Sequence, residues 1–249
     1  MGREAKTAWV TGGGTGIGRG IAAALADDGY TVYITGRRST VLEEAVGWYA
    51  DRGTGAGEGE LIAAPADVTS EGALREVLAR IQAERDRLDV LVVSSGINVS
   101  HRSIEETTPD EWKRILEVNA TGTFLVIKTA LDILKKSASG LIVNVSSVAG
   151  LRPLAMAGVA YSASKYASHV LGAFAGNELA ELGIRVTNVY PGEVNTPLLD
   201  ERAEPPSQEK RSQMVQPEEI GRIVALIAAL PATAHVSEIV LKPRYQAFV

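Results

Sequence analysis

The 249-residue sequence contains no cysteine and only three histidines, and both shortages exclude whole classes of chemistry. Without cysteine the chain forms no disulfide, no thiolate metal site and no cysteine nucleophile. His101, His169 and His235 lie far apart along the chain, which argues against a zinc hydrolase or a Ser-His-Asp enzyme. We expect no metal site, and we interpret His101 and His169 as structural or surface residues.

The chain also lacks an excess of positive charge and any long apolar run. Lys and Arg number 25 against 30 Asp and Glu, and the formal net charge of −5 disfavours nucleic acid or an anionic membrane as a partner. No stretch approaches the ~18 apolar residues of a transmembrane helix. The N-terminus runs directly into a strand-like segment, which leaves no room for a secretory signal. These absences predict a soluble, cytoplasmic protein.

Apolar residues make up 45% of the chain and fall in short runs that alternate with longer amphipathic stretches. The expected strands are 7–10, 31–34, 61–64, 90–93, 141–145, 184–189 and 238–241. The expected helices are 17–26, 40–49, 73–84, 110–117, 124–136, 161–182 and 218–230, with a surface turn over 53–59. This alternation indicates an α/β fold with a doubly wound, mostly parallel sheet and helices on both faces. We expect a single domain over residues 1–249 that binds ligands beyond the carboxyl ends of its strands.

A glycine-rich segment, Thr11-Gly12-Gly13-Gly14-Thr15-Gly16-Ile17-Gly18, follows the first expected strand. Glycine permits a tight turn and close approach of the backbone to a phosphate, and the start of the next helix offers unpaired N–H donors. The order of strand, glycines and helix favours binding of a dinucleotide. The candidate contacts are Gly12, Gly14, Thr15, Gly16, Ile17 and Gly18.

The end of the second strand is where a dinucleotide's adenosine ribose is usually bound. The segment there is Thr35-Gly36-Arg37-Arg38, which has two guanidiniums and no acid. A carboxylate would repel a 2′-phosphate, whereas arginine can bind one through two parallel hydrogen bonds. We therefore expect a preference for NADP(H) over NAD(H). The alternative is that Arg37 and Arg38 are two solvated surface residues.

Four residues near the expected ligand crevice are candidates for a catalytic role. Tyr161 and Lys165 lie four residues apart on one helix face, where a cation can lower the tyrosine pKa toward the working range. Ser147 closes the fifth strand at the carboxyl edge of the sheet. Asn119 falls between two helical stretches, where an ordinary helix-end cap is the simpler interpretation.

In order and spacing, these motifs resemble the short-chain dehydrogenase/reductase family over essentially the whole chain. Residues 11–18 resemble its glycine motif, and Asp67 and Val68 match the pair that contacts adenine. Asn119, Ser147, Tyr161 and Lys165 match its catalytic tetrad, and residues 191–196 match its nicotinamide-side loop. The resemblance implies a Rossmann fold and an oxidoreductase that interconverts a carbonyl and a secondary alcohol.

The resemblance also implies a role for each residue. Tyr161 would exchange a proton with the substrate oxygen, and Ser147 would hydrogen-bond that oxygen. Lys165 would lower the tyrosine pKa and bind the nicotinamide ribose, and Asn119 would hold a water of the proton relay. Further cofactor contacts are implied for Ser94, Ser95, Gly96, Pro191, Gly192, Val194 and Thr196.

The chain departs from the family pattern in three places. Residues 93–96 read Val-Ser-Ser-Gly instead of Asn-Asn-Ala-Gly, so the end of the fourth strand has to be braced differently. Thr15 stands where some NADP-preferring members carry a basic residue, so the 2′-phosphate argument depends on Arg37 and Arg38 alone. The tail 235–244 lacks the usual glycines. It is more similar to reductases of short hydroxy acids, amino-alcohol acids and miscellaneous carbonyls than to fatty-acid 3-oxoacyl reductases.

Substrate choice is expected in the residues after Gly96, in 150–160 and in the loop 195–216, which carries three prolines among many charges. The first segment supplies Asn98, Ser100, His101 and Arg102. Arg152 is the expected partner of an anionic substrate, although it could equally be an exposed residue or a subunit contact. The expected substrate is a small hydroxy acid or ketone.

Two alternatives to this function remain open. A 3-oxoacyl-thioester reductase would need a basic surface beside the cleft, for which the chain offers only the scattered Arg102, Lys113 and Arg114. A non-catalytic nucleotide-binding scaffold or regulator would have no need for Tyr161 and Lys165 together. In either case the resemblance implies a homo-oligomer, commonly a tetramer, built through helices 123–136 and 161–182 and the last strand.

Overall fold

The computed structural model describes residues 6–53 and 59–247, so most of the turn expected at 53–59 lies outside the described residues. Seven parallel strands form one sheet in the order β3-β2-β1-β4-β5-β6-β7. The strands are β1 Thr7–Thr11, β2 Thr31–Thr35, β3 Glu60–Ala63, β4 Val90–Val93, β5 Leu141–Val145, β6 Arg185–Pro191 and β7 Glu238–Leu241. The doubly wound α/β fold expected from the sequence is confirmed.

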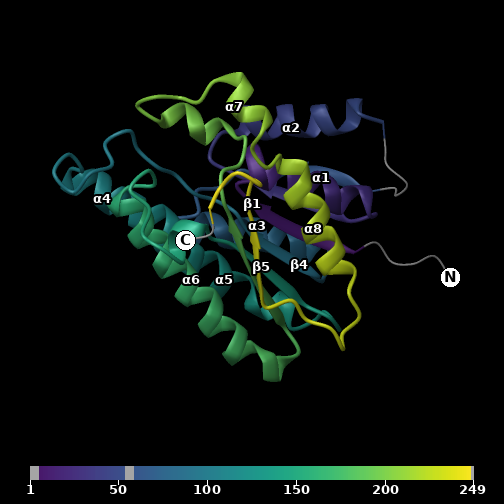
Figure 1. Cartoon of the computed structure of the whole chain (residues 1–249). Helices are drawn as coiled ribbons and strands as arrows, with labels where there is room; N and C mark the ends of the chain where they lie inside the picture. The colour runs from purple at the N-terminus through teal and green to yellow at the C-terminus, as the bar shows by residue number, and fades with distance from the viewer. Residues whose placement is uncertain (1–5, 54–58, 248–249) are drawn as a thin grey trace.

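Helices cover both faces of the sheet (Figure 1). One layer contains α1 Gly16–Asp27, α2 Ser39–Asp51 and α8 Pro217–Ala229, and the other contains α3 Glu71–Arg85, α5 Gly122–Leu134 and α6 Val159–Leu179. Two shorter helices, α4 Pro109–Leu116 and α7 Gln208–Ser212, lie near the carboxyl ends of the strands. Each layer buries its own apolar core against the sheet.

The strands supply both cores because successive side chains of a strand point to opposite faces. Val10, Ile34 and Val92 face the layer of α1, α2 and α8, whereas their neighbours Trp9 and Leu91 face the layer of α3 and α5. All of these side chains are buried. Because the strands are buried on both faces of the sheet, apolar and polar residues do not alternate along them.

The direction of strand order reverses between β1 and β4, and the glycine segment lies at the carboxyl end of β1 at this switch. Here Thr11 replaces the amide side chains that the strand end lacks. Its hydroxyl oxygen accepts hydrogen bonds from the backbone N–H groups of Ser94 and Ser95, at 3.2 and 3.4 Å. The end of β4 is therefore held by a side chain of the neighbouring strand.

Two segments differ from the sequence-based expectation. The expected helices 110–117 and 124–136 are joined by a π-helical turn, Glu117–Thr121, so Asn119 lies inside a continuous helical segment. The interpretation of Asn119 as a helix-end cap is wrong, because Asn119 lies inside the π-helical turn and the C-cap of α4 is Glu117. The loop 195–216 is more regular than expected: it contains a 3₁₀ turn, Pro197–Glu201, and α7, and Val194 forms a bridge with Val215.

Candidate active site

The glycine segment turns the chain sharply from β1 into α1. Gly12 and Gly16 have positive φ angles of 67° and 52°, which side-chain-bearing residues rarely adopt. A Cβ atom on Gly12 would lie 2.8 Å from the carbonyl oxygen of Ser94, and one on Gly16 would lie 3.0 Å from Cγ2 of Thr196. These glycines therefore allow the segments after β4 and β6 to close on the start of α1.

The start of α1 is left without side-chain partners. Thr15 is its N-cap but makes no capping hydrogen bond, and the first turn contains no acidic residue. The first N–H groups of a helix have no intrahelical partner, and together with the helix dipole they attract an anion. These donors face a groove that Gly12, Gly18, Ser94 and Gly96 also line. The site fits the diphosphate of a dinucleotide.

The groove continues past the end of β2 to the candidate adenosine contacts. Arg37 and Arg38 line this part together with Asp67, Val68 and Ser95. Both arginines are exposed, and in the part of the chain that the structure describes neither has an ion-pair partner. The Asp67 carboxylate accepts hydrogen bonds from the N–H and hydroxyl groups of the residue two positions later, at 2.9 and 2.8 Å. The two guanidiniums are thus free to bind a phosphate.

Tyr161 and Lys165 project from the first turns of α6 into the same groove. The Lys165 side chain is buried, its Nζ donates to the carbonyl oxygen of Val145 at 3.0 Å, and it lies 5.7 Å from the centroid of the Tyr161 ring. Burial lowers the pKa of Lys165 to about 8. The structure therefore brings the two residues together at the carboxyl end of β5, as the sequence predicts.

Asn119 braces the segment after β4 from the π-helical turn. Its Oδ1 accepts from the N–H of Ile97 at 2.8 Å, while Nδ2 donates to the carbonyl oxygen of Ile97 and to Oγ of Ser164, both at 3.0 Å. Both amide hydrogens are thus used within the protein. A water held by this side chain has only the remaining lone pair of Oδ1 available, and the relay role of Asn119 stays a prediction.

Three features of the surroundings change the pKa of the Tyr161 hydroxyl. Part of the ring can be reached from the cavity, but burial around the hydroxyl raises the pKa of Tyr161. A hydrogen bond with the Ser147 hydroxyl and the charge of the Arg102 guanidinium lower that pKa. Arg102 is thus a cation beside the tyrosine whose role the sequence did not reveal, because it lies in a loop with no periodic pattern. The effect of Lys165 on this pKa stays a prediction.

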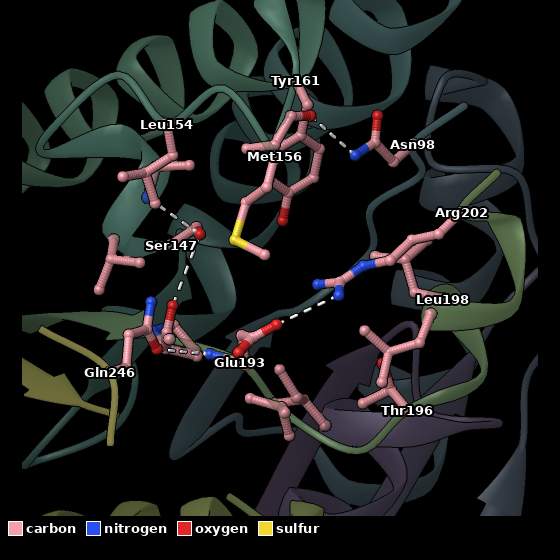
Figure 2. Close-up of a pocket in the computed structure, with 18 of the residues that line it drawn as sticks. Asn98, Ser147, Leu154, Met156, Tyr161, Glu193, Thr196, Leu198, Arg202 and Gln246 are labelled. Carbon is pink, nitrogen blue, oxygen red and sulfur yellow. Dashed lines mark hydrogen bonds and ion pairs between the residues drawn. The ribbon is translucent and has the colours of Figure 1, made fainter. Parts of the chain in front are cut away.

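The cavity beside Tyr161 is lined by Ser147 and by the loop that follows β6 (Figure 2). The Ser147 hydroxyl accepts from the N–H of Ala149 at 3.1 Å and lies 3.5 Å from the carbonyl oxygen of Pro191. Gly192, Val194 and Thr196 line the same cavity. All of the candidate residues of the nicotinamide-side loop therefore line the cavity that Tyr161 also lines.

The charged residues of this cavity differ from the expectation. Arg152 does not line it: its Nη1 donates to the carbonyl oxygen of Leu151, and it faces a neighbouring cavity. Arg102 and Arg202 line the cavity instead, together with Glu193. Arg202 comes from the loop 195–216, where the sequence predicts substrate contacts but gives no sign of which charge points inward.

The histidines behave as expected. His101 is exposed and lies 3.2 Å from a carboxylate oxygen of Glu111. Nδ1 of His169 lies 2.6 Å from the hydroxyl of the buried Tyr190, which is a structural contact. Within residues 6–53 and 59–247, no group of three or more acidic or histidine side chains could hold a metal ion, and no helix could span a membrane.

Comparison with known proteins agrees with this geometry. The family described as short chain dehydrogenase matches residues 6–207, and the chain belongs to this family of oxidoreductases. Cyclopentanol dehydrogenase of Comamonas sp. is 32% identical over 99% of this chain and 100% of its own.

Two solved structures have closely similar folds. An alcohol dehydrogenase from the archaeon Thermococcus sibiricus, complexed with 5-hydroxy-NADP, has a TM-score of 0.86 and 27% identity, covering 99% of this chain and 100% of its own. A 3-ketoacyl-(acyl-carrier-protein) reductase from Brucella melitensis, complexed with NADH, has a TM-score of 0.83 and 25% identity, covering 96% of this chain and 97% of its own.

Proposed function

We propose that the protein is an NADP(H)-dependent oxidoreductase that interconverts a carbonyl group and a secondary alcohol. The observation that carries this proposal is that Tyr161 and Lys165 line the same groove as the glycine segment, with Ser147 in the cavity beside them. A residue that can move a proton thus lies next to a site that fits a dinucleotide. When bound there, the cofactor supplies the acceptor or donor of a hydride.

The groove offers suitable contacts for each part of the cofactor. The N–H groups at the start of α1 hold the diphosphate, and Asp67 and Val68 contact the adenine. Arg37 and Arg38 bind the 2′-phosphate, which favours NADP(H). The buried Lys165 binds the nicotinamide ribose. The residues that orient the nicotinamide line the cavity beside Tyr161, and they are Pro191, Gly192, Val194 and Thr196.

Tyr161 moves the proton of the reaction. During oxidation the substrate hydroxyl gives its proton to Tyr161 while the hydrogen on its carbon leaves as hydride, so a carbonyl forms; reduction reverses both transfers. The Ser147 hydroxyl donates to the substrate oxygen and stabilises the charge that develops on it. Tyrosine needs a lowered pKa for this work. Ser147 and Arg102 act in that direction, and we propose that Lys165 does so too.

The cavity has a volume of about 120 Å³ and is lined in part by the proposed nicotinamide contacts, so the substrate that it admits is small. A cavity of roughly 150 Å³ holds benzene, so a small hydroxy acid or ketone is the proposed substrate. A 3-oxoacyl-thioester reductase is the second candidate, because one structural neighbour is named as such an enzyme. This activity would need a strongly basic surface beside the cleft. Lys113 and Arg114 are exposed, but the charge of Lys113 is partly balanced by Asp110 at 4.0 Å.

We also infer that the chain forms a homo-oligomer, with a tetramer as the expected form. The support is a row of exposed apolar side chains on α6. Tyr166, Val170 and Phe174 are four residues apart, so they share one face of the helix, and their exposed fractions are 37%, 59% and 67%. Phe124 on the neighbouring α5 is 47% exposed. Contiguous apolar surface of this kind marks an interface.

Replacement of the proposed acid/base residue tests the function. Tyr161→Phe removes only the hydroxyl, so we expect kcat to fall at least ~100-fold while the Kd of NADPH stays within about twofold. Steady-state kinetics with a panel of small ketones and oxo acids, and an NADPH fluorescence titration, measure the two quantities. Tyr166→Phe, five residues further along α6, is the matched control and should keep full activity. Retained turnover in Tyr161→Phe would refute the proposal.

A further inference from the structure

Two arginines enter the cavity that contains Ser147 and Tyr161. Arg102 comes from the segment after β4, and Arg202 follows the 3₁₀ turn Pro197–Glu201. The two guanidiniums are close enough that the charge of Arg202 lowers the pKa of Arg102. Figure 2 shows the Arg202 side chain extending into the cavity toward Glu193. Two like charges thus face one small space.

Arg102 has no acidic partner in the described part of the chain. Its Nε donates to the carbonyl oxygen of Val99 at 2.8 Å, and its Nη1 donates to that of Met156 at 2.7 Å. Both acceptors are neutral. The remaining nitrogen, Nη2, makes no hydrogen bond to any described residue. Arg102 is half-buried, so its charge is partly withdrawn from water, and this burial lowers its pKa. A desolvated charge of this kind is stabilised when an anion binds beside it.

Arg202, by contrast, already has a counter-charge. Its Nη1 lies 3.1 Å from Oε1 of Glu193, and both side chains are largely buried. Glu193 is itself fixed by the C-terminal segment: its Oε2 accepts from the Tyr245 hydroxyl at 2.8 Å, and its N–H donates to Oε1 of Gln246 at 3.0 Å. Glu193 is the only acid that lines the cavity among the described residues. Two guanidiniums and one carboxylate leave one positive charge, on Arg102.

Resting on the proposed function, we infer that the substrate is a small monocarboxylate, a hydroxy acid in one direction and an oxo acid in the other. Its carboxylate binds the free edge of Arg102, with Arg202 beside it, while its hydroxyl or carbonyl oxygen lies at Ser147 and Tyr161. A carboxylate suits the planar guanidinium fork and supplies the single negative charge that the cavity lacks. The carboxylate is unchanged by the reaction.

The inference is tested with matched pairs of substrates. Small oxo acids of three to six carbons and their methyl esters contain the same reacting carbonyl group, but only the acids carry a negative charge. We expect the wild-type protein to reduce the acids with a KM at least ~10-fold lower than the esters, as for a charge-assisted hydrogen bond. Arg102→Met should raise the KM of the acids by about that factor and leave the KM of the esters nearly unchanged. Arg152→Met, in the neighbouring cavity, is the matched control.

Further variants and a binding measurement separate a charge effect from a structural one. Arg102 also acts on the Tyr161 pKa, so Arg102→Met is expected to shift the pH profile of kcat for acids and esters alike; only the KM difference reports carboxylate binding. Arg102→Lys, which keeps the charge, should recover part of the affinity for acids. In thermal unfolding with bound NADP+, which carries no hydride to transfer, acetoacetate should stabilise the wild-type protein more than Arg102→Met.

The outcomes distinguish the inference from the proposed function. If neutral ketones or esters are reduced as well as the acids, or if Arg102→Met weakens acids and esters equally, the carboxylate inference is wrong and the oxidoreductase function stands. If no carbonyl compound of either kind is turned over with NADPH or NADH, the proposed function itself fails.

Discussion

Arg37 and Arg38 show how much of cofactor choice depends on single side chains. They follow β2 directly, line the groove and have no ion-pair partner among the described residues. Thr15 supplies no positive charge at the position where some relatives carry one. Any preference for the phosphorylated cofactor therefore has to come from these two guanidiniums. Sequence reasoning can find them because the end of the second strand is a fixed place in this fold.

Replacement of both arginines should remove the preference. In the double variant Arg37→Ala, Arg38→Ala we expect the Kd of NADPH to rise ~10- to 100-fold, because charge-assisted hydrogen bonds to the phosphate are lost, while the Kd of NADH changes little. Paired fluorescence titrations with NADPH and NADH measure both constants. Arg75→Ala, which removes an exposed arginine paired with Glu71 on α3, is the control. Equal binding of the two cofactors by the wild-type protein would contradict the preference.

Single residues also mark the limit of sequence reasoning about the site. Tyr161, Lys165 and Ser147 could be predicted because they lie at fixed positions on a helix and at a strand end. Arg102 and Arg202 lie in loops, where no periodicity indicates the direction of a side chain. Arg152 was expected either as the partner of an anionic substrate or as an exposed residue, and it is exposed beside a neighbouring cavity. Only the three-dimensional structure distinguishes it from Arg102.

At the scale of elements, the strands were predicted closely because each is a continuous apolar run. The strands at 90–93 and 238–241 have the expected bounds. β6 extends to Pro191, although proline is ordinarily a sign of a strand end, because Pro191 still pairs in register with Leu241 of the neighbouring strand. The π-helical turn around Asn119 was not predicted, since its sequence lacks the glycine or proline that usually signals an interruption.

The support of β4 by Thr11 gives a prediction for this element. Thr11→Val keeps the shape of the side chain but leaves the N–H groups of Ser94 and Ser95 without their acceptor. We expect the free energy of unfolding to fall by about 1 kcal/mol, the net contribution of hydrogen bonds to N–H groups that are only partly buried. Urea unfolding measures this loss, and Thr40→Val at an exposed position of α2 is the control. An unchanged unfolding midpoint would show that the strand end is held by other contacts.

At the scale of the whole molecule, the distinctive feature is the row of apolar side chains on α5 and α6, which remains exposed to solvent in a single chain. Tyr166, Val170 and Phe174 project away from the sheet that the rest of α6 covers. The sequence indicates surplus apolar residues on this helix, but it cannot show which of them remain exposed after the core is filled. The exposed fractions make this surface the expected contact between copies.

Charge placed on this surface should dissociate the assembly. Sedimentation of the wild-type protein at micromolar concentration is expected to show an oligomer, and Val170→Glu, Phe174→Glu should shift it toward the monomer because two carboxylates would be buried in the contact. Ala50→Glu, at an exposed position of α2 in the opposite helix layer, is the control and should leave the assembly intact. A single monomeric wild-type species would refute the prediction.

The contacts of the C-terminal segment with Glu193 have a practical consequence. Tyr245 and Gln246 hold the residue that balances Arg202, so the last described part of the chain forms part of the cavity wall. A substitution at Tyr245 or Gln246 would release Glu193 and so change the charge balance around Arg202. Such a change would reach the proposed substrate without altering any residue that touches it.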